Sequence, residues 1–318
     1  MPAYNGLPYI KEAIDSVLSQ EHEYWELLIS NDNSSDKTSD YLNSLNDKRI
    51  QVYNQKQNLG IFDNLNFLIN KSNYPVAKIL CQDDRLLPGS LYLSLEFMNA
   101  HPACAVSRCR QIGDGSRFAT ESRHALEGLL PSVLKPDAAI LALATFGCII
   151  GNLTRATIRP KLILEAGGFD QNYPFSGDWE GWIRVASHFG IYLQQEELVF
   201  VRAHKKQNSI LLDMKNENIP QTNALLQKLS TLVDSKYISI LNKHWTIHFY
   251  SPRVSRALHQ ILSLEIRLAI QTLTSGPVNI SMLDLFLHYI PWKFHLKSAR
   301  KTTQILFDYI IYENNKND

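Results

Sequence analysis

The chain has few cysteines, no long apolar run and no block of like charges, and each absence excludes a class of protein. Its four cysteines form no CxxC pair and no His/Cys pattern with zinc spacing, which argues against a structural zinc site and a disulfide framework. No run of about 18 apolar residues could span a bilayer, and no charged and apolar leader opens the sequence. The net charge of +1 argues against a nucleic-acid partner. We therefore expect a cytoplasmic protein, free or peripheral to the inner face of the plasma membrane.

Short apolar runs alternate with amphipathic stretches through the first part of the 318 residues. Pro8–Gln20 places its apolar residues at helical spacing, and Trp25–Ile29 is typical of a strand. The expected elements that follow are helix Lys37–Leu45, strand Ile50–Tyr53, helix Ile61–Asn70, strand Val76–Cys81 and helix Ser90–Asn99. This alternation predicts an α/β fold with a doubly wound, parallel sheet flanked by helices. The pattern then weakens, with a turn at Gly113–Gly115 and a candidate strand at Thr145–Ile150.

The composition changes beyond about residue 216, where long helical stretches replace the alternation. They are Thr222–Val233, Val254–Thr272, Met282–Tyr289 and Ser298–Tyr312. We expect one domain at residues 1–215 and a helical C-terminal region at 216–318. Residues 241–318 carry nine Lys/Arg against five Asp/Glu, beside aromatic residues such as Trp245 and Trp292. Two interpretations stay open: peripheral contact with an anionic membrane surface, or a packed helical cap with a solvated basic face.

Adjacent acids follow a strand at Asp83 and Asp84. In an open α/β sheet, ligands bind in the crevice outside the carboxyl ends of the strands. Mg²⁺ or Mn²⁺ is usually held there by one or two carboxylates together with substrate phosphates. An acidic surface loop is the alternative for such a pair taken alone. Asp32 ends the Trp25–Ile29 strand in the same way, which favours a shared site at one sheet edge.

A third acid, Asp178, lies in the segment Phe175–Trp182 beside two tryptophans. A carboxylate between aromatic walls can act as a general base, and Trp179 and Trp182 could stack on sugar rings of an acceptor. The alternative is equally open: the tryptophans are core anchors on one helix face, and Asp178 caps that helix.

An ordered set of segments resembles the family 2 glycosyltransferases over about residues 1–210. The opening match comprises Met1-Pro2-Ala3-Tyr4-Asn5, Ile14–Gln20 and Trp25–Asp36. It continues with Asn58-Leu59-Gly60, Gln82-Asp83-Asp84, Leu87-Pro88-Gly89, Gly167–Asp170, Gly177-Asp178-Trp179 and Arg202-Ala203-His204. The resemblance implies a GT-A fold with a mixed sheet. It also implies a nucleotide-sugar part at about 1–105 and an acceptor part at about 106–215.

The resemblance further implies inverting transfer of a sugar from a nucleoside diphosphate to an acceptor hydroxyl. Donor-binding roles fall on Pro2, Ala3, Tyr4, Asn5, Asp32, Asn58, Gly60 and Asp83. A Mn²⁺ or Mg²⁺ cofactor would be held by Asp84 and His204, and Asp178 would be the catalytic base. The expected partners are a nucleoside-diphosphate sugar, with uridine as the family's commonest base, and a glycan or lipid-linked acceptor.

The chain also departs from the family pattern. Cys81 stands where the family often has an acid, Asn31 replaces a frequent acid, Gly177 replaces a frequent Glu, and Asn64 stands where a basic donor is frequent. The family begins with an apolar strand before its Pro-x-Tyr-Asn, whereas Pro2 follows Met1 directly. We expect a first strand that is missing or truncated, and a gain in soluble yield and melting temperature on upstream extension.

The leading hypothesis is a glycosyltransferase of cell-surface polysaccharide or glycolipid synthesis. One alternative is a non-catalytic relic that binds nucleotide sugars. A sugar nucleotidyltransferase is less favoured, because it would want a Gly-rich and basic loop after the first strand and residues 2–6 offer none.

Overall fold

The structure is a computed structural model that describes most of the chain. The described residues are 1–113, 125–204, 218–250, 257, 260–262, 265–267, 270 and 296–316. The chain divides into two compact units, which are described separately below. The first comprises Met1–Pro136 and Cys148–His204, and the second comprises Asp137–Gly147 and Lys205–Asp318. The sequence division at residue 215 did not anticipate that an internal segment, residues 137–147, joins the C-terminal helices.

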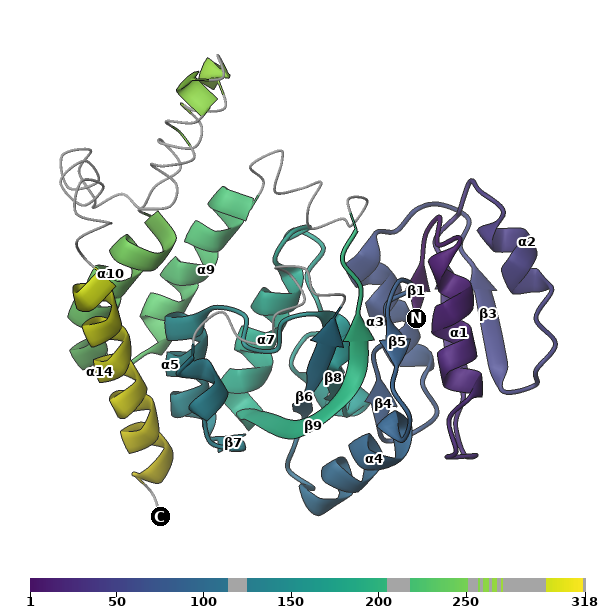
Figure 1. The fold of residues 1–318 in the computed structure, drawn as a ribbon, viewed down its shortest axis with the longest axis horizontal. Coiled ribbons are helices and arrows are strands. Elements are labelled where there is room, and N and C mark those ends of the chain that lie inside the picture. The colour runs from purple at the N-terminus through teal and green to yellow at the C-terminus, as the bar shows by residue number, and fades with distance from the viewer. Residues whose placement is uncertain are drawn as a thin grey trace. The chain divides into compact units, whose positions relative to one another are not determined.

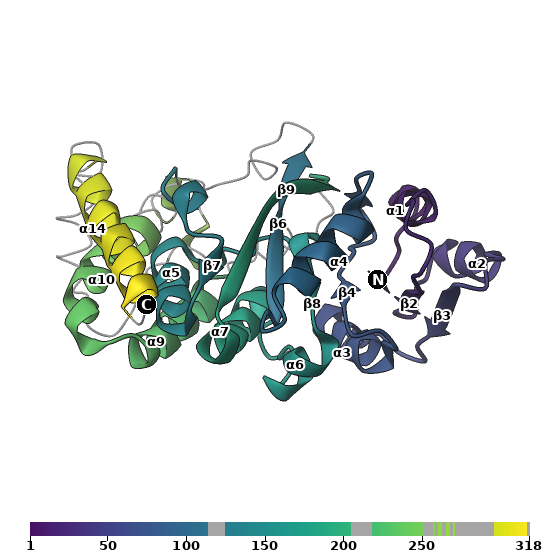
Figure 2. The same cartoon turned by 90° about the horizontal axis from the view of Figure 1, so that it is seen from below.

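The first unit begins with a parallel three-stranded sheet in the order β1-β2-β3. The strands are β1 (Pro2–Ala3), β2 (Leu27–Asn31) and β3 (Ile50–Asn54), and the helices around them are α1 (Tyr9–Leu18), α2 (Thr38–Asn43) and α3 (Ile61–Lys71). Figure 2 shows α1 and α3 on opposite sides of this sheet. All five residues of β2 are buried, as expected for a strand covered on both faces.

A second, mixed sheet completes the first unit, with strand order β4-β8-β6-β9-β5 and β7 paired to β9. Its strands are β4 (Ala77–Lys78), β5 (Arg85–Leu86), β6 (Val106–Gly113), β7 (Val133–Leu134), β8 (Ala156–Ile158) and β9 (Ile191–Val201). Helices α4 (Ser90–Ala100), α6 (Pro160–Glu165) and α7 (Gly177–Phe189) connect them (Figures 1 and 2). The 3₁₀ turns η1 (Glu127–Leu129) and η2 (Leu153–Arg155) also lie between these strands in the sequence. Among the pairings of this sheet that the described residues form, β6 and β9 pair in parallel and the others are antiparallel. The parallel sheet predicted from the alternation is therefore correct for β1 to β3 and wrong for the second sheet.

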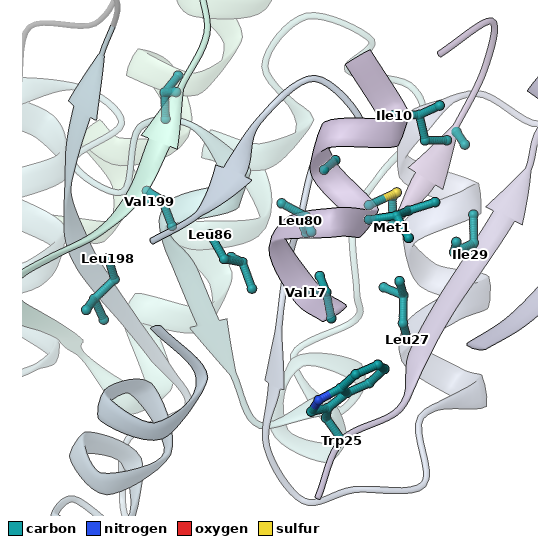
Figure 3. Close-up of a cluster of buried hydrophobic side chains, with 14 of the residues drawn as sticks. Met1, Ile10, Val17, Trp25, Leu27, Ile29, Leu80, Leu86, Leu198 and Val199 are labelled. Atoms are coloured by element: carbon teal, nitrogen blue, oxygen red, sulfur yellow. The ribbon is translucent and has the colours of Figure 1, made fainter. Parts of the chain in front are cut away.

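The hydrophobic core between α1 and β2 explains why these elements form where the sequence places them. Ile10, Ile14 and Val17 recur at helical spacing on α1 and are buried against Leu27 and Ile29 of β2 (Figure 3). An apolar cavity of about 500 Å³ also lies in the first unit, and side chains of α3, β2 and β4 are among those that line it. The first strand, expected to be missing or truncated, is present as β1, which has two residues and pairs with β2. The expected benefit of upstream extension stays a prediction.

The second unit is helical. Its described elements are α5 (Pro136–Phe146), α9 (Asn218–Leu232), η3 (Ser235–Tyr237), α10 (Ile238–Trp245), the π-helical turn η4 (Thr246–Tyr250) and α14 (Leu296–Asn315). The Nε1 of Trp245 donates to the carbonyl of Ala144 at 2.7 Å, and this tryptophan is buried. Burial favours the packed-cap interpretation for Trp245 and removes it from any membrane contact. Within the described part of the chain, no helix combines the length and the apolar character needed to span a membrane.

Most of the predicted helices are confirmed, with shifts of a few residues at their ends. The candidate strand at Thr145–Ile150 is wrong, because Thr145 belongs to α5, where nine consecutive residues are buried. An all-round apolar segment can be a strand or a buried helix, and periodicity does not separate the two. The strand expected at Val76–Cys81 is reduced to Ala77–Lys78. The predicted helix Met282–Tyr289, most of Val254–Thr272 and most of the Gly113–Gly115 turn lie outside the described residues.

Candidate functional site

Asp32 organises the loop between β3 and α3. Its carboxylate is buried and accepts hydrogen bonds from the backbone N–H groups of Leu59 at 2.7 Å and Gly60 at 3.0 Å. The side-chain amide of Asn58 donates to the Asp32 carbonyl at 3.3 Å. Gly60 has φ +80°, a conformation that glycine adopts without steric cost. Asp32 is thus brought together with Asn58 and Gly60, which lie 26 and 28 residues further along the chain and were also predicted to bind the donor.

The loop after β1 is joined to the segment that carries the acid pair. The Tyr4 N–H donates to Gln82 Oε1 at 2.9 Å, and Gln82 Nε2 donates back to the Tyr4 carbonyl at 3.0 Å. Asn5 Oδ1 accepts from the N–H of Ser35 at 2.8 Å, which connects this loop to the one after β2. The side chain of Tyr4 is 47% exposed and can meet a ligand. Pro2 and Ala3 differ, because they form β1 and are buried.

The two adjacent acids have different surroundings. Asp84 is fully buried, and its carboxylate accepts from Thr154 Oγ1 at 2.6 Å and from the Arg202 N–H at 3.0 Å. Burial, followed by the nearby Asp83, raises the pKa of Asp84 to about 7. Asp83 is partly exposed, and its Oδ2 lies 3.0 Å from Nε2 of His204. The sequence paired His204 with Asp84 for the metal, whereas the structure brings His204 to Asp83.

Cys81, Asp83 and Asp84 form the one group of metal-type ligands found in the described ranges. One donor atom from each residue lies within 4.8 Å of the other two. The Cys81 backbone N–H donates to Thr154 Oγ1 at 3.0 Å, so this threonine bonds both Cys81 and Asp84. Carboxylate oxygens suit Mg²⁺ and Mn²⁺, and sulfur suits softer cations. The residues present therefore fit a divalent cation.

Helix α1 supports the His204 side of this cluster through residues that the sequence did not single out. Arg202 donates from Nη2 to Glu12 Oε2 at 2.6 Å and from Nε to the Asp83 carbonyl at 3.1 Å. Its guanidinium lies 4.6 Å from the centre of the Tyr9 ring, whose other neighbour is the His204 ring at 4.9 Å. Tyr9 and Glu12 are three residues apart on one helix face. The three-residue spacing of Tyr9 and Glu12 is the signal that the sequence offers for this contact, and it does not show that Arg202 and His204 are their partners.

Asp178 is the second residue of α7. Its Oδ1 accepts from the Trp179 N–H at 2.7 Å, and its Oδ2 lies 4.0 Å from Sγ of Cys148. The loop that begins with Cys148 continues to Thr154, which bonds Asp84. One short segment therefore contacts both the predicted base and the acid pair. A carboxylate at a helix N-terminus is favoured in its ionised form, which a general base requires.

Gly177 explains one departure from the family pattern. A Cβ added to this residue would lie 2.6 Å from Cε2 of Phe62 and 2.9 Å from the carbonyl oxygen of Asp170. Contacts this short do not occur in real structures, so a glutamate could not stand there without a shift of the neighbours. The glycine is the residue that the local packing allows.

The two tryptophans predicted to bind the acceptor are buried. Trp179 is 6% exposed and Trp182 is 0% exposed. Trp182 packs edge-on against Phe169, with ring centres 5.0 Å apart. A ring without exposed surface has no face on which a sugar can stack, so the structure contradicts an acceptor contact for these residues. They are core anchors of α7, as the alternative interpretation held.

The fold is of the GT-A type, and the sequence comparisons point to a glycosyltransferase family. Residues 1–155 match the model of glycosyl transferase family 2. An uncharacterized glycosyltransferase of Rickettsia typhi is 27% identical over 217 residues, which are 66% of this chain and 64% of that protein. TuaG of Bacillus subtilis, named for teichuronic acid biosynthesis, is 34% identical over 108 residues, 33% of this chain and 42% of that protein. The N-terminal half of the chain, residues 1–155, is that of a family 2 glycosyltransferase, and the chain spans less than two thirds of either relative.

Solved structures show the same fold. Residues 1–349 of Staphylococcus aureus TarS in complex with UDP align with a TM-score of 0.56 and 15% identity, over 100% of this chain and 90% of that one. The mannosyltransferase PcManGT of Pyrobaculum calidifontis in complex with GDP-Man and Mn²⁺ aligns with a TM-score of 0.57 and 15% identity, over 100% and 86%. At this level of identity the likeness establishes the fold.

Proposed function

We propose that this protein is an inverting glycosyltransferase that moves a sugar from a nucleoside-diphosphate sugar to an acceptor hydroxyl. The observation that carries the proposal is the convergence of loops at the sheet edge. The Asp32 carboxylate holds Leu59 and Gly60, Gln82 holds Tyr4, and the loop from Cys148 to Thr154 contacts both Asp178 and Asp84. Family membership and the fold support the same activity.

The nucleotide would lie between the loops after β1, β2 and β3. Tyr4 offers an exposed ring to a base, and Asn5 and Asn58 offer side-chain amides beside it. Both Asp32 oxygens already accept backbone N–H groups, so any contact with a base imide would use their remaining lone pairs. The similar structures hold UDP in TarS and GDP-Man in PcManGT, which supports a nucleotide-sugar donor and leaves two bases to be compared.

The cation would be Mn²⁺ or Mg²⁺, and Asp84 would hold it together with Asp83 and His204. The side chains of His204 and Asp83 are 18% and 20% exposed, and Asp84 is fully buried. A bound divalent cation would neutralise the charge that develops on the departing diphosphate. Tyr9, Glu12 and Arg202 would keep the His204 segment against the acid pair.

Asp178 is proposed as the base. In an inverting transfer, the acceptor oxygen forms a bond to the anomeric carbon while the bond from that carbon to the diphosphate oxygen breaks. The acceptor proton passes to the carboxylate on the acceptor side. The Trp179 N–H fixes one Asp178 oxygen, and a fixed orientation is what proton transfer in the transition state needs.

The acceptor is proposed to be a glycan or a lipid-linked sugar of a cell-surface polysaccharide or glycolipid. The similarity to TuaG supports this assignment. We also propose a peripheral contact of the C-terminal region with a membrane. The excess of basic residues in 241–318 supports this contact, and Trp245 takes no part in it because it is buried.

The test is to incubate the protein with UDP- and GDP-sugars, Mn²⁺ and a panel of sugar acceptors, and to follow nucleoside diphosphate release. We expect turnover with at least one donor. Asp178→Asn should lower turnover by at least about 100-fold, the usual contribution of general base catalysis. It should also leave the nucleotide-induced shift in melting temperature intact. Glu165→Gln, a conservative change at the exposed end of α6, is the matched control.

Each other outcome identifies an error. An Asp178→Asn variant with wild-type turnover would remove Asp178 as the base. Nucleotide binding without turnover across all acceptors would favour the non-catalytic relic. Pyrophosphate release from a nucleoside triphosphate and a sugar phosphate would favour the nucleotidyltransferase.

A further inference from the structure

Cys81 differs from the other cysteines by its neighbours. Cys104 and Cys109 are buried in the core, and Cys148 lies beside Asp178. Cys81 is partly exposed, and its sulfur belongs to the group of donor atoms that lie within 4.8 Å of one another with Asp83 and Asp84. The sequence treated this position as the loss of an acid. In the structure the position still supplies a donor atom.

The backbone around Cys81 is held in place for this arrangement. Thr154 Oγ1 accepts from the Cys81 N–H at 3.0 Å and donates to Asp84 Oδ2 at 2.6 Å, so one hydroxyl orients both residues. The sulfur itself lies 4.0 Å from Asn152 Oδ1 and also interacts with the Thr154 hydroxyl, so the thiol has polar neighbours within the protein. It lies against two carboxylates, a setting in which a divalent cation would relieve the accumulated negative charge.

A core role for the thiol is the alternative, since cysteine is often a small buried hydrophobe. That role accounts for Cys104 and Cys109, which are 0% exposed. It does not account for the place of Cys81, a half-buried residue whose sulfur lies within 4.8 Å of donor oxygens of Asp83 and Asp84.

We propose that Cys81 is itself a ligand of the donor-site cation, and that its sulfur shifts the cation preference away from Mg²⁺ toward ions that accept sulfur. The inference rests on the proposed function for the place of the cation beside the nucleotide. Mg²⁺ demands near-octahedral oxygen coordination, whereas thiolate ligands favour Zn²⁺ and Cd²⁺, and Mn²⁺ lies at the hard end of the ions that such a mixed site would take. A site of this kind should be loaded by Mn²⁺ or Cd²⁺ at concentrations where Mg²⁺ leaves it empty.

The test uses Cd²⁺ as a spectroscopic probe. The full-length reduced protein is titrated with Cd²⁺, with and without UDP, and the ultraviolet thiolate-to-metal charge-transfer band is recorded. We expect a saturable band of one equivalent in the wild-type protein and in Cys148→Ser, the control for the other partly exposed thiol. Cys81→Ser should lose the band and bind Cd²⁺ at least about tenfold more weakly, as expected when a soft ligand is lost.

Cys81→Asp provides the complementary variant. A third carboxylate should restore cation binding without the band and lower the preference for Mn²⁺ over Mg²⁺, measured from the melting-temperature shift that each cation produces. The wild-type protein gives a further readout that needs no variant. Cd²⁺ should slow the alkylation of Cys81 by iodoacetamide, mapped by mass spectrometry, relative to the alkylation of Cys148.

The outcomes separate this inference from the proposed function. One outcome is an equal Mn²⁺-dependent shift in melting temperature with UDP in wild type and Cys81→Ser, and no charge-transfer band. That result would overturn the sulfur ligand and leave the proposed nucleotide site intact. A charge-transfer band that neither UDP nor sugar nucleotides change would support the sulfur ligand and count against the proposed function. A wild-type protein that binds none of these cations would overturn the inference outright.

Discussion

The buried Asp84 makes a quantitative prediction about stability. Replacing it by asparagine keeps the shape of the side chain and removes its charge. The amide oxygen can accept the Arg202 N–H, and the amide nitrogen can donate to the Thr154 hydroxyl, which is able to rotate. The variant therefore isolates the cost of an ionised carboxylate at a position with no exposed surface.

The magnitude follows from the raised pKa. Burial and the neighbouring Asp83 raise the pKa of Asp84 from 3.8 to about 7, which corresponds to about 4 kcal/mol between the two protonation states. Below pH 4 the group is protonated in both the folded and unfolded protein, so the penalty is absent. Between pH 4 and 7 the folded protein holds the proton that the unfolded chain has lost, and stability falls as the pH rises. Above pH 7 the full penalty is present.

The assay is urea unfolding of the wild type and Asp84→Asn in EDTA at several pH values from 4.5 to 8. The free energy of unfolding of the variant, relative to the wild type, should rise by about 3 kcal/mol across this range, because the first part of the penalty is already present at pH 4.5. The paired comparison cancels the titration of groups that both proteins share. A difference that stays constant with pH would show that Asp84 is not the titrating group, and a difference that falls with pH would show that its ionised form is stabilised.

Two further predictions concern packing and positioning. Gly177→Ala should lower the free energy of unfolding by about 1–3 kcal/mol, because the new methyl group overlaps Phe62. Gly128→Ala is the control and should change the free energy of unfolding little, because a Cβ there meets nothing within 4 Å. Equal effects of the two substitutions would refute the packing argument. Glu12→Gln should raise the KM for the sugar nucleotide by up to about fivefold with little change in melting temperature, because a half-exposed ion pair contributes about 1 kcal/mol or less. Glu21→Gln, an exposed change just beyond α1, is the kinetic control, and an unchanged KM in Glu12→Gln would remove the positioning role.

Local sequence signals were sufficient for most of the α/β half. Apolar residues at helical spacing located α1, and the turn-forming run after Ile29 located the end of β2, because these signals act within a few residues. They failed where an element is buried on all sides. The segment that forms α5 is apolar all round, so periodicity could not separate a buried helix from a strand.

The candidate site was predictable in part. Asp32, Asn58 and Gly60 were selected from the sequence and lie together. His204 was paired with Asp84 from the sequence, whereas it lies beside Asp83. The tryptophans beside Asp178 were misassigned because sequence spacing shows a shared helix face and does not show whether that face meets ligand or core. Glu12 and Tyr9 were missed because their partners lie about 190 residues away in the chain.

The sequence by itself determined the alternation of strands and helices, the family, and the positions of Asp32, Asp83, Asp84 and Asp178 at the ends or beginnings of elements. Local propensity and motif order are properties of neighbouring residues, so a sequence carries them directly. Only the tertiary structure decided which acid is buried and which faces His204, that the Trp182 ring is enclosed, and that the sulfur of Cys81 joins the two carboxylates. These facts depend on side-chain direction and on contacts between distant segments, which arise only when the chain packs.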